Sequence, residues 1–149
     1  MLLSISNHRP YTYPEGRIPL EPEKWGRLGG VMYADYAIGE FIKEAKSKPW
    51  FDNTLFVFIA DHTAGASGKE EINLEGYHIP FIIYAPKLVK TQRIDTPISQ
   101  IDALPTILGI LNFDYESRFY GQDALSEDYE SRFFVSNYQK IGFVKNGTD

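Results

Sequence analysis

Two residues with metal-ligating side chains stand side by side after an apolar run. Asp61 and His62 follow residues 54–60 (TLFVFIA). A continuous β-branched and aromatic run predicts a strand buried on both faces of a parallel sheet, and ligands of open α/β sheets gather at the carboxyl ends of such strands. A carboxylate and an imidazole there suit Zn²⁺, Mn²⁺ or Mg²⁺. The alternative, favoured for the pair alone, is that Asp61 caps a loop and His62 is an ordinary polar residue.

Other polar side chains are explained without catalysis. Asp102 is placed to cap the helix that follows it. Asp35 and Glu40 lie on a predicted helix, where a solvated or capping role is the better interpretation. Ser99 and Thr106 are hydroxyls without a visible base partner and without a Gly-x-Ser-x-Gly context, so we assign neither as a nucleophile.

The positioning elements follow from hydrophobic periodicity. Apolar residues at three- and four-residue steps predict a helix with one buried stripe at residues 25–46. The further predictions are strands at 54–60 and 79–85, a helix at 103–111, a C-terminal hairpin of 133–138 with 140–145 at the edge of the sheet, and loops at 7–22 and 63–77. This order is typical of an α/β sheet. The strand-like start at residues 1–6 has no lead-in, which suggests a chain cut from a longer one.

Composition excludes several classes of function. A chain of 149 residues is long enough for one compact domain. The net charge of -5, without a basic cluster, argues against nucleic-acid binding. Cysteine is absent, which excludes thiolate nucleophiles and cysteine-based zinc sites. No apolar run approaches the roughly 20 residues that span a bilayer, so we expect neither a span nor an export signal in this chain.

Several segments of the chain carry known motifs in a shared order. Residues 50–62 (WFDNTLFVFIADH) are similar to the strand and metal-ligand motif of the sulfatases and other members of the alkaline phosphatase superfamily. Residues 4–11 (SISNHRPY) resemble the segment that carries a substrate-binding histidine in the lipoteichoic acid synthase and phosphoethanolamine transferase groups. Later segments match in the same order: 78–86 (HIPFIIYAP), 99–108 (SQIDALPTIL) and 120–123 (YGQD), with 33–41 in the first helix.

The resemblance implies a fold and a site. The fold would be a partial alkaline phosphatase-like α/β/α sandwich with a mostly parallel sheet and a C-terminal hairpin, and residues 1–149 would be a single C-terminal portion of a sulfatase-like catalytic domain. Asp61 and His62 would be ligands of a divalent ion, either Mn, Mg, Zn or Ca. His8 would be catalytic and bind the transferred phosphoryl or sulfuryl group. His78 is interpreted as a residue leading into a strand rather than as a ligand of a second metal.

The resemblance also implies a reaction. In the family a metal-activated Thr, Ser or formylglycine attacks phosphorus or sulfur, and that residue precedes the segment of His8, so we expect the chain alone to be catalytically incomplete. Thr63 after His62 is closer to the lipoteichoic acid synthase branch. The first hypothesis is therefore a phosphoglycerol transferase-like hydrolase or transferase of phosphate or sulfate esters, lipid- or glycan-linked ones included.

Two alternatives remain open. One is an arylsulfatase-type sulfuric ester hydrolase. The other is a noncatalytic α/β module whose Tyr- and Pro-rich loop, residues 8–22, binds a partner or glycan. By resemblance the full-length enzyme would act on the extracytoplasmic side of a bacterial inner or plasma membrane and contact the membrane only through an N-terminal region that this chain lacks.

Overall fold

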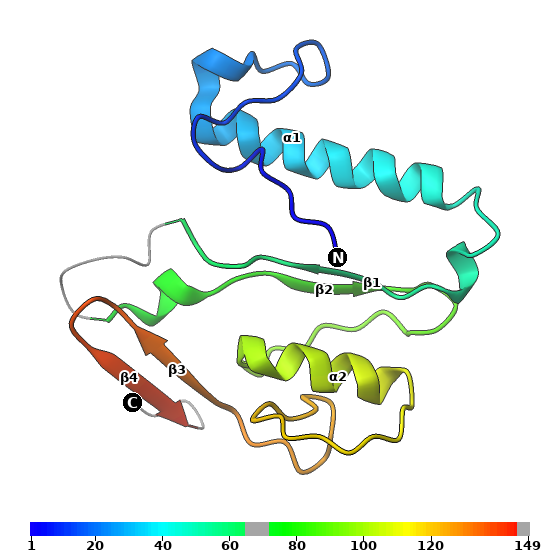
Figure 1. The fold of residues 1–149 in the computed structure, drawn as a ribbon, viewed down its shortest axis with the longest axis vertical. Helices are drawn as coiled ribbons and strands as arrows, with labels where there is room; N and C mark the ends of the chain where they lie inside the picture. Colours follow the sequence, from blue (N-terminus) through cyan, green and yellow to red (C-terminus); the bar gives the residue numbers. More distant parts are fainter. Residues whose placement is uncertain (65–71, 146–149) are drawn as a thin grey trace. The chain divides into compact units, whose positions relative to one another are not determined.

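The computed structural model describes residues 1–64 and 72–145. The chain divides into two compact units, residues 1–54 and 55–149, and each is described by itself (Figure 1). None of the helices in the described residues is both long and apolar enough to cross a bilayer.

The first unit is an ordered loop followed by the helix α1 (Pro22–Ala45) and the short 3-10 helix η1 (Phe51–Asn53). A proline occupies the first turn of α1, where its missing N–H leaves no bond unmade. Gly26 has φ 49° and ψ -125°, so α1 is two helical pieces joined at a kink. Lys43 in the last turn complements the negative end of the helix dipole.

The loop packs on α1 at two adjacent glycines. A Cβ at Gly30 would lie 2.6 Å from the carbonyl oxygen of Ser6, and a Cβ at Gly29 would overlap the ring of Tyr13. That ring is buried and stacks on Tyr33, with ring centroids 5.2 Å apart. The helix and the loop therefore approach each other at the positions where side chains are missing.

Two predictions for this unit need correction. The predicted helix is confirmed, but its apolar stripe is not buried, because Leu28, Val31, Ile38 and Phe41 are all exposed. Residues 1–6 form no strand. The common physical reason is that the described part of this unit contains only loop and helix, so it offers no sheet to extend and no second layer to cover the stripe.

The second unit begins with the strands β1 (Phe56–Ile59) and β2 (Phe81–Tyr84). They pair antiparallel, with Phe56 opposite Tyr84 and Ile59 opposite Phe81. The predicted strands are confirmed, whereas their predicted parallel pairing is wrong. An apolar run indicates burial but contains no information about strand direction, and Ile59 and Ile82 are in fact exposed.

The connection between these strands contains the 3-10 helix η2 (Leu74–Tyr77). We predicted a loop at residues 63–77, of which 65–71 lie outside the described residues.

The rest of the second unit is a helix and a hairpin. The 3-10 helix η3 (Gln100–Asp102) leads directly into α2 (Ala103–Ile110), as predicted for 103–111 within the usual uncertainty of helix ends. β3 (Arg132–Ser136) and β4 (Ile141–Lys145) form the predicted hairpin, with Val135 and Val144 buried. The hairpin is a separate two-stranded sheet and not an edge of the β1–β2 sheet.

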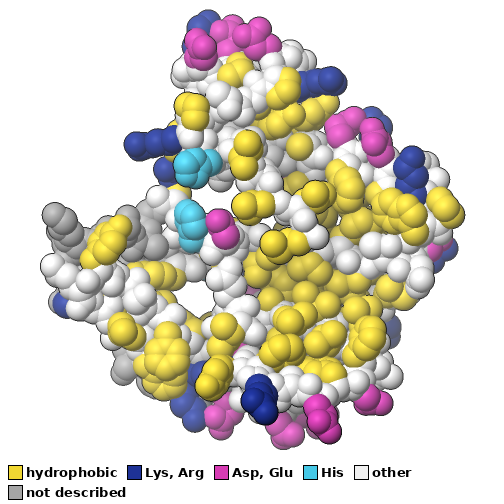
Figure 2. Space-filling model, in the orientation of Figure 1, with side chains coloured by type: hydrophobic (Ala, Val, Ile, Leu, Met, Phe, Trp, Pro, Cys, Tyr) yellow, Lys and Arg dark blue, Asp and Glu magenta, His cyan; other side chains and the backbone are white. Residues whose placement is uncertain are grey.

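Large apolar side chains remain at the surface, as the yellow side chains in Figure 2 show. In the second unit they include Ile82 on β2 and Leu104 on α2. The fully buried side chain among the described residues is not apolar but is the carboxylate of Asp102.

Candidate metal centre and its support

Asp61 and His62 lie just after the end of β1 and are open to solvent. Their side chains are 69% and 76% exposed, and Oδ2 of Asp61 lies 3.6 Å from Nε2 of His62. The backbone N–H of His62 donates to Oδ1 of Asp61 over 2.9 Å. The carboxylate therefore has one oxygen tied to the backbone and the other facing the imidazole.

The imidazole of His62 is fixed in one tautomer. Its Nδ1 lies 2.8 Å from the carbonyl oxygen of Thr63. A carbonyl only accepts hydrogen bonds, so Nδ1 carries the proton, and in the neutral ring Nε2 keeps its lone pair. Metal-ligating histidines in general are oriented by such a hydrogen bond, donated by the ring nitrogen that does not bind the metal.

The pair fits a divalent cation in chemistry and spacing. Nitrogen and oxygen donors each about 2.1 Å from a tetrahedral Zn²⁺ are about 3.4 Å apart, close to the observed 3.6 Å between Oδ2 and Nε2. Within residues 1–64 and 72–145, however, no three His, Cys, Asp or Glu side chains cluster as a metal site would require. These two residues would therefore supply only part of a coordination shell.

Gln100 supports the backbone of the pair from a distant segment. Its Nε2 donates to the carbonyl oxygens of Ala60 and Asp61, each over 3.1 Å. On the other side of the pair, the hydroxyl of Thr63 donates to the carbonyl of Gly76. Sequence reasoning did not identify Gln100, since a polar residue before a helix gives no signal of a contact 40 positions away.

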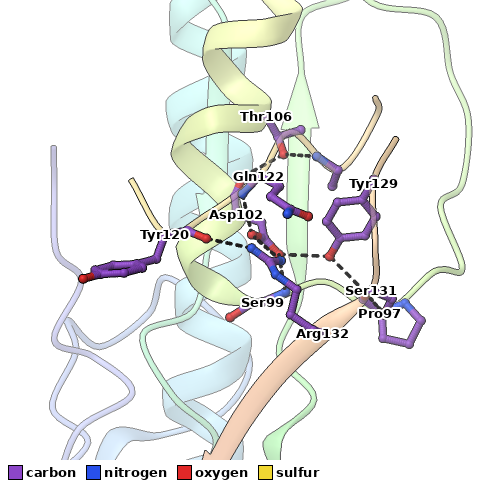
Figure 3. Close-up of polar contacts among 10 residues, drawn as sticks. Pro97, Ser99, Asp102, Thr106, Tyr120, Gln122, Tyr129, Ser131 and Arg132 are labelled. Atoms are coloured by element: carbon purple, nitrogen blue, oxygen red, sulfur yellow. Dashed lines mark hydrogen bonds and ion pairs between the residues drawn. The ribbon is translucent and has the colours of Figure 1, made fainter. Parts of the chain in front are cut away.

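The segment that carries Gln100 is held by a buried carboxylate (Figure 3). Asp102 is 0% exposed and its ion-pair partner Arg132 is 17% exposed, with 3.0 Å between Nη1 and Oδ1. The carboxylate also accepts from the hydroxyl of Tyr129 over 2.9 Å. Backbone N–H groups of Ser99 and Gln122 donate to it over 2.9 and 2.8 Å. A buried carboxylate is tolerable only with this degree of compensation.

This network corrects the predicted role of Asp102. Its side chain does not cap α2. It closes a capping box one 3-10 turn earlier, where Ser99 is the N-cap. Thr106 also has a structural role, because its hydroxyl donates to the carbonyl of Asp102 over 2.7 Å and accepts from the N–H of Ala124 over 2.9 Å. Both hydroxyls that we did not assign as nucleophiles thus have structural hydrogen-bond partners.

The environment of Asp102 changes the acidity of Tyr129. Burial, and then the hydrogen bond to the negative carboxylate, raises the pKa of Tyr129 to about 12. Both causes oppose the phenolate, because its charge would be desolvated and would repel Asp102. Tyr129 is therefore a permanent donor to this carboxylate at neutral pH.

His8 lies in the first unit, and its predicted partnership with Asp61 and His62 stays a prediction. Its Nδ1 lies 2.8 Å from the carbonyl oxygen of Arg9, so Nδ1 is the donor there. Nε2 then donates a hydrogen bond only when the ring is an imidazolium. Next to it, Tyr11 accepts from Nε and Nη2 of Arg27 over 3.2 and 3.1 Å. The hydrogen bond from Arg27 lowers the pKa of Tyr11.

The remaining candidates have ordinary surroundings. His78 is the exposed C-cap residue of η2, which agrees with a role leading into β2. Glu40 pairs with Lys43 over 3.2 Å at the surface of α1, and Asp35 is exposed on the same helix.

An apolar hollow of about 310 Å³ lies elsewhere in the second unit. Its lining comes from η3, α2 and the following loop: Ile101, Leu104, Pro105, Arg118, Phe119 and Tyr120, with Gly121. Neither Asp61 nor His62 lines it, so the hollow and the candidate metal ligands are different places.

Comparison with known proteins identifies relatives of this chain. The sulfatase family model matches residues 1–113. The chain is 31% identical over 115 residues to the lipoteichoic acid synthase-like YvgJ of Bacillus subtilis, covering 66% of this chain and 19% of that protein. It is 29% identical over 127 residues to an ulvan-active sulfatase of Formosa agariphila, covering 79% and 25%. The chain thus spans a quarter or less of these relatives.

A solved structure has the same fold. The crystal structure of a protein in the alkaline phosphatase superfamily from Vibrio parahaemolyticus matches with a TM-score of 0.84 and 32% identity, covering 93% of this chain and 35% of that chain. This likeness confirms the predicted α/β, alkaline phosphatase-like fold class.

Proposed function

Because the chain belongs to the sulfatase family of the alkaline phosphatase superfamily, we propose that it forms part of the active site of a metal-dependent enzyme that hydrolyses or transfers a phosphate or sulfate ester. The observation that carries the proposal is the Asp61–His62 pair. Its carboxylate oxygen Oδ2 and ring nitrogen Nε2 lie 3.6 Å apart, and because Nδ1 donates to the Thr63 carbonyl, the neutral ring has its lone pair on Nε2.

Asp61 and His62 hold a divalent ion, and His8 binds the transferred phosphoryl or sulfuryl group. When bound, such an ion supplies Lewis-acid stabilisation of the ester oxygens and activates a nucleophile. Because Nδ1 of His8 already donates to the carbonyl of Arg9, the transferred group would contact this ring at Nε2.

The reaction is shared with residues outside this chain. We propose that residues 1–149 are a C-terminal portion of the catalytic domain and that the attacking Thr, Ser or formylglycine belongs to another part of it. The chain spans only 19–25% of the two relatives named above. The purified chain is therefore expected not to turn over aryl phosphates or sulfates, and metal-dependent turnover would contradict this part of the proposal.

Phosphoglycerol transfer is the preferred reaction and sulfate ester hydrolysis the alternative. Thr63 after His62 supports the preference, as does the similarity to a lipoteichoic acid synthase-like protein. The ulvan-active sulfatase supports the alternative. With the preferred reaction, we propose that the whole enzyme acts on the extracytoplasmic side of a bacterial membrane and that its substrate is lipid- or glycan-linked. The nucleophile of the whole enzyme decides between them, since Thr indicates transfer and formylglycine indicates a sulfatase.

Zinc titration of the chain, followed by the backbone amide NMR resonances of residues 61–63, tests the proposed ligands. We expect a saturable response that weakens at least about tenfold in Asp61→Ala and in His62→Ala. Asp114→Ala is the matched control, because Asp114 is exposed and lies outside the candidate site. An unchanged midpoint in both ligand variants, or no response of the wild-type chain at millimolar zinc, would reject the site.

The whole enzyme separates catalysis from a noncatalytic binding role. There we expect Asp61→Ala to lower turnover by several orders of magnitude, as other metal-site lesions do. A noncatalytic module that binds through residues 8–22 predicts that the same substitution leaves activity unchanged.

A further inference from the structure

We infer that Gln100 is a positioning residue for the proposed metal ligands, an inference that rests on the proposed function. It lies 39 residues beyond Asp61 and yet bonds to the backbone on both sides of it. Nε2 of Gln100 is 3.1 Å from the carbonyl oxygen of Ala60 and 3.1 Å from that of Asp61. The side chain of Gln100 contacts the strand end and not the ligand atoms themselves.

These two carbonyls determine the direction of the Asp61 side chain. The carbonyl of Ala60 belongs to the peptide plane before the Cα of Asp61, and the carbonyl of Asp61 belongs to the plane after it. A residue has two soft backbone dihedrals, one for each of these planes. Holding both planes therefore fixes φ and ψ of Asp61, and with them the direction of its Cα–Cβ bond.

The same restraint reaches His62. The plane after Asp61 carries the N–H of His62, which donates to Oδ1 of Asp61 over 2.9 Å. This bond leaves Oδ2 facing Nε2 of the imidazole at 3.6 Å. One glutamine amide thus constrains the backbone that sets the spacing of both ligand atoms.

A glutamine amide suits this position. The Nε2 group has two N–H donors and can give one to each carbonyl, whereas a glutamate has only acceptors and would repel both oxygens. The backbone of Gln100 is itself held in place. It opens η3 between Ser99 and Asp102, whose capping box and buried ion pair with Arg132 hold that turn.

The test uses Gln100→Ala and the nearly isosteric Gln100→Glu in the same 149-residue chain. In metal-free protein we expect the His62 amide to exchange with solvent about fivefold faster, the equivalent of one lost hydrogen bond. Zinc is expected to bind about tenfold more weakly, the usual cost of losing a group that orients a ligand. The melting temperature should change little, because Gln100 is exposed. Gln92→Ala, at another exposed glutamine, is the control.

The outcomes separate this inference from the proposed function. Unchanged His62 exchange and unchanged zinc binding in Gln100→Ala would overturn the positioning role even if Asp61→Ala abolishes zinc binding. A Gln100→Glu variant that behaves like wild type would also overturn it, because shape and not hydrogen bonding would then matter. If Asp61→Ala binds zinc normally, the proposed site fails, while faster exchange in both Gln100 variants would still establish the backbone restraint.

Discussion

Arg132 on β3 and Asp102 in η3 form a buried ion pair, with Nη1 3.0 Å from Oδ1. The guanidinium also donates from Nη2 to the carbonyl of Tyr120 over 2.7 Å. Three separate segments of the second unit meet at this pair: the turn before α2, the loop after it and the hairpin. Its removal should therefore affect the whole unit and not a single contact.

Substituting Arg132 by Met tests that role. The variant leaves a carboxylate that is 0% exposed without its charge partner, and breaking such a pair costs about 3–5 kcal/mol in the free energy of unfolding. Urea denaturation followed by circular dichroism measures the change. Lys145→Met is the matched control, because the pair of Lys145 with Glu130 is solvent-exposed and exposed pairs contribute little. A similar loss in both variants would show that burial does not matter here.

The raised pKa of Tyr129 predicts that the folded state loses stability at alkaline pH. Its pKa is raised to about 12 from about 10 in the unfolded chain. Between these values the folded state keeps a proton that the unfolded state has lost, so the contribution is fully present below pH about 10 and is lost as pH rises toward about 12. The stability difference between wild type and Tyr129→Phe should shrink across this window. Tyr138→Phe, at an exposed tyrosine, is the control variant.

Two glycines of α1 should respond to alanine with opposite signs. At Gly30 a Cβ would lie 2.6 Å from the carbonyl oxygen of Ser6, so we expect Gly30→Ala to lower the free energy of unfolding by about 1–3 kcal/mol. At Gly39 a Cβ meets nothing within 4 Å, so Gly39→Ala should raise it by about 0.5–1 kcal/mol through helix propensity. Thermal unfolding measures both, and stabilisation by Gly30→Ala would refute the close packing of loop and helix.

The sequence predicted the elements better than their pairing. Periodicity located α1, both strands of the first sheet, α2 and the hairpin, because each depends on local residue pattern. It did not predict that Phe56 faces Tyr84 in an antiparallel ladder, because strand direction depends on the path of the chain between strands. The prediction that the apolar stripe of α1 is buried was wrong for a related reason, because periodicity identifies an apolar face but not what covers it.

The candidate site could likewise be predicted from the sequence only in part. Asp61 and His62 drew attention by their place after an apolar strand, but only the resemblance to the sulfatases favoured a ligand role for them, and that role stays a prediction. The double hydrogen bond of Gln100 and the buried pair of Asp102 with Arg132 join residues 39, 40 and 30 positions apart. Contacts of that separation leave no local pattern, so Asp102 was interpreted as a helix cap and Gln100 was not identified.

The reach of Gln100 also bears on the order of folding. The contacts that form the β1–β2 pair and the turn at η3 join residues closer along the chain than Gln100 and Ala60 are. Closing the longer loop between Gln100 and Ala60 costs more chain entropy before other contacts offset it. We therefore expect the strand terminus with its acidic and imidazole side chains to become ordered late during refolding. In kinetic terms, any small loss of stability in the Gln100 variants should appear as faster unfolding and not as slower refolding.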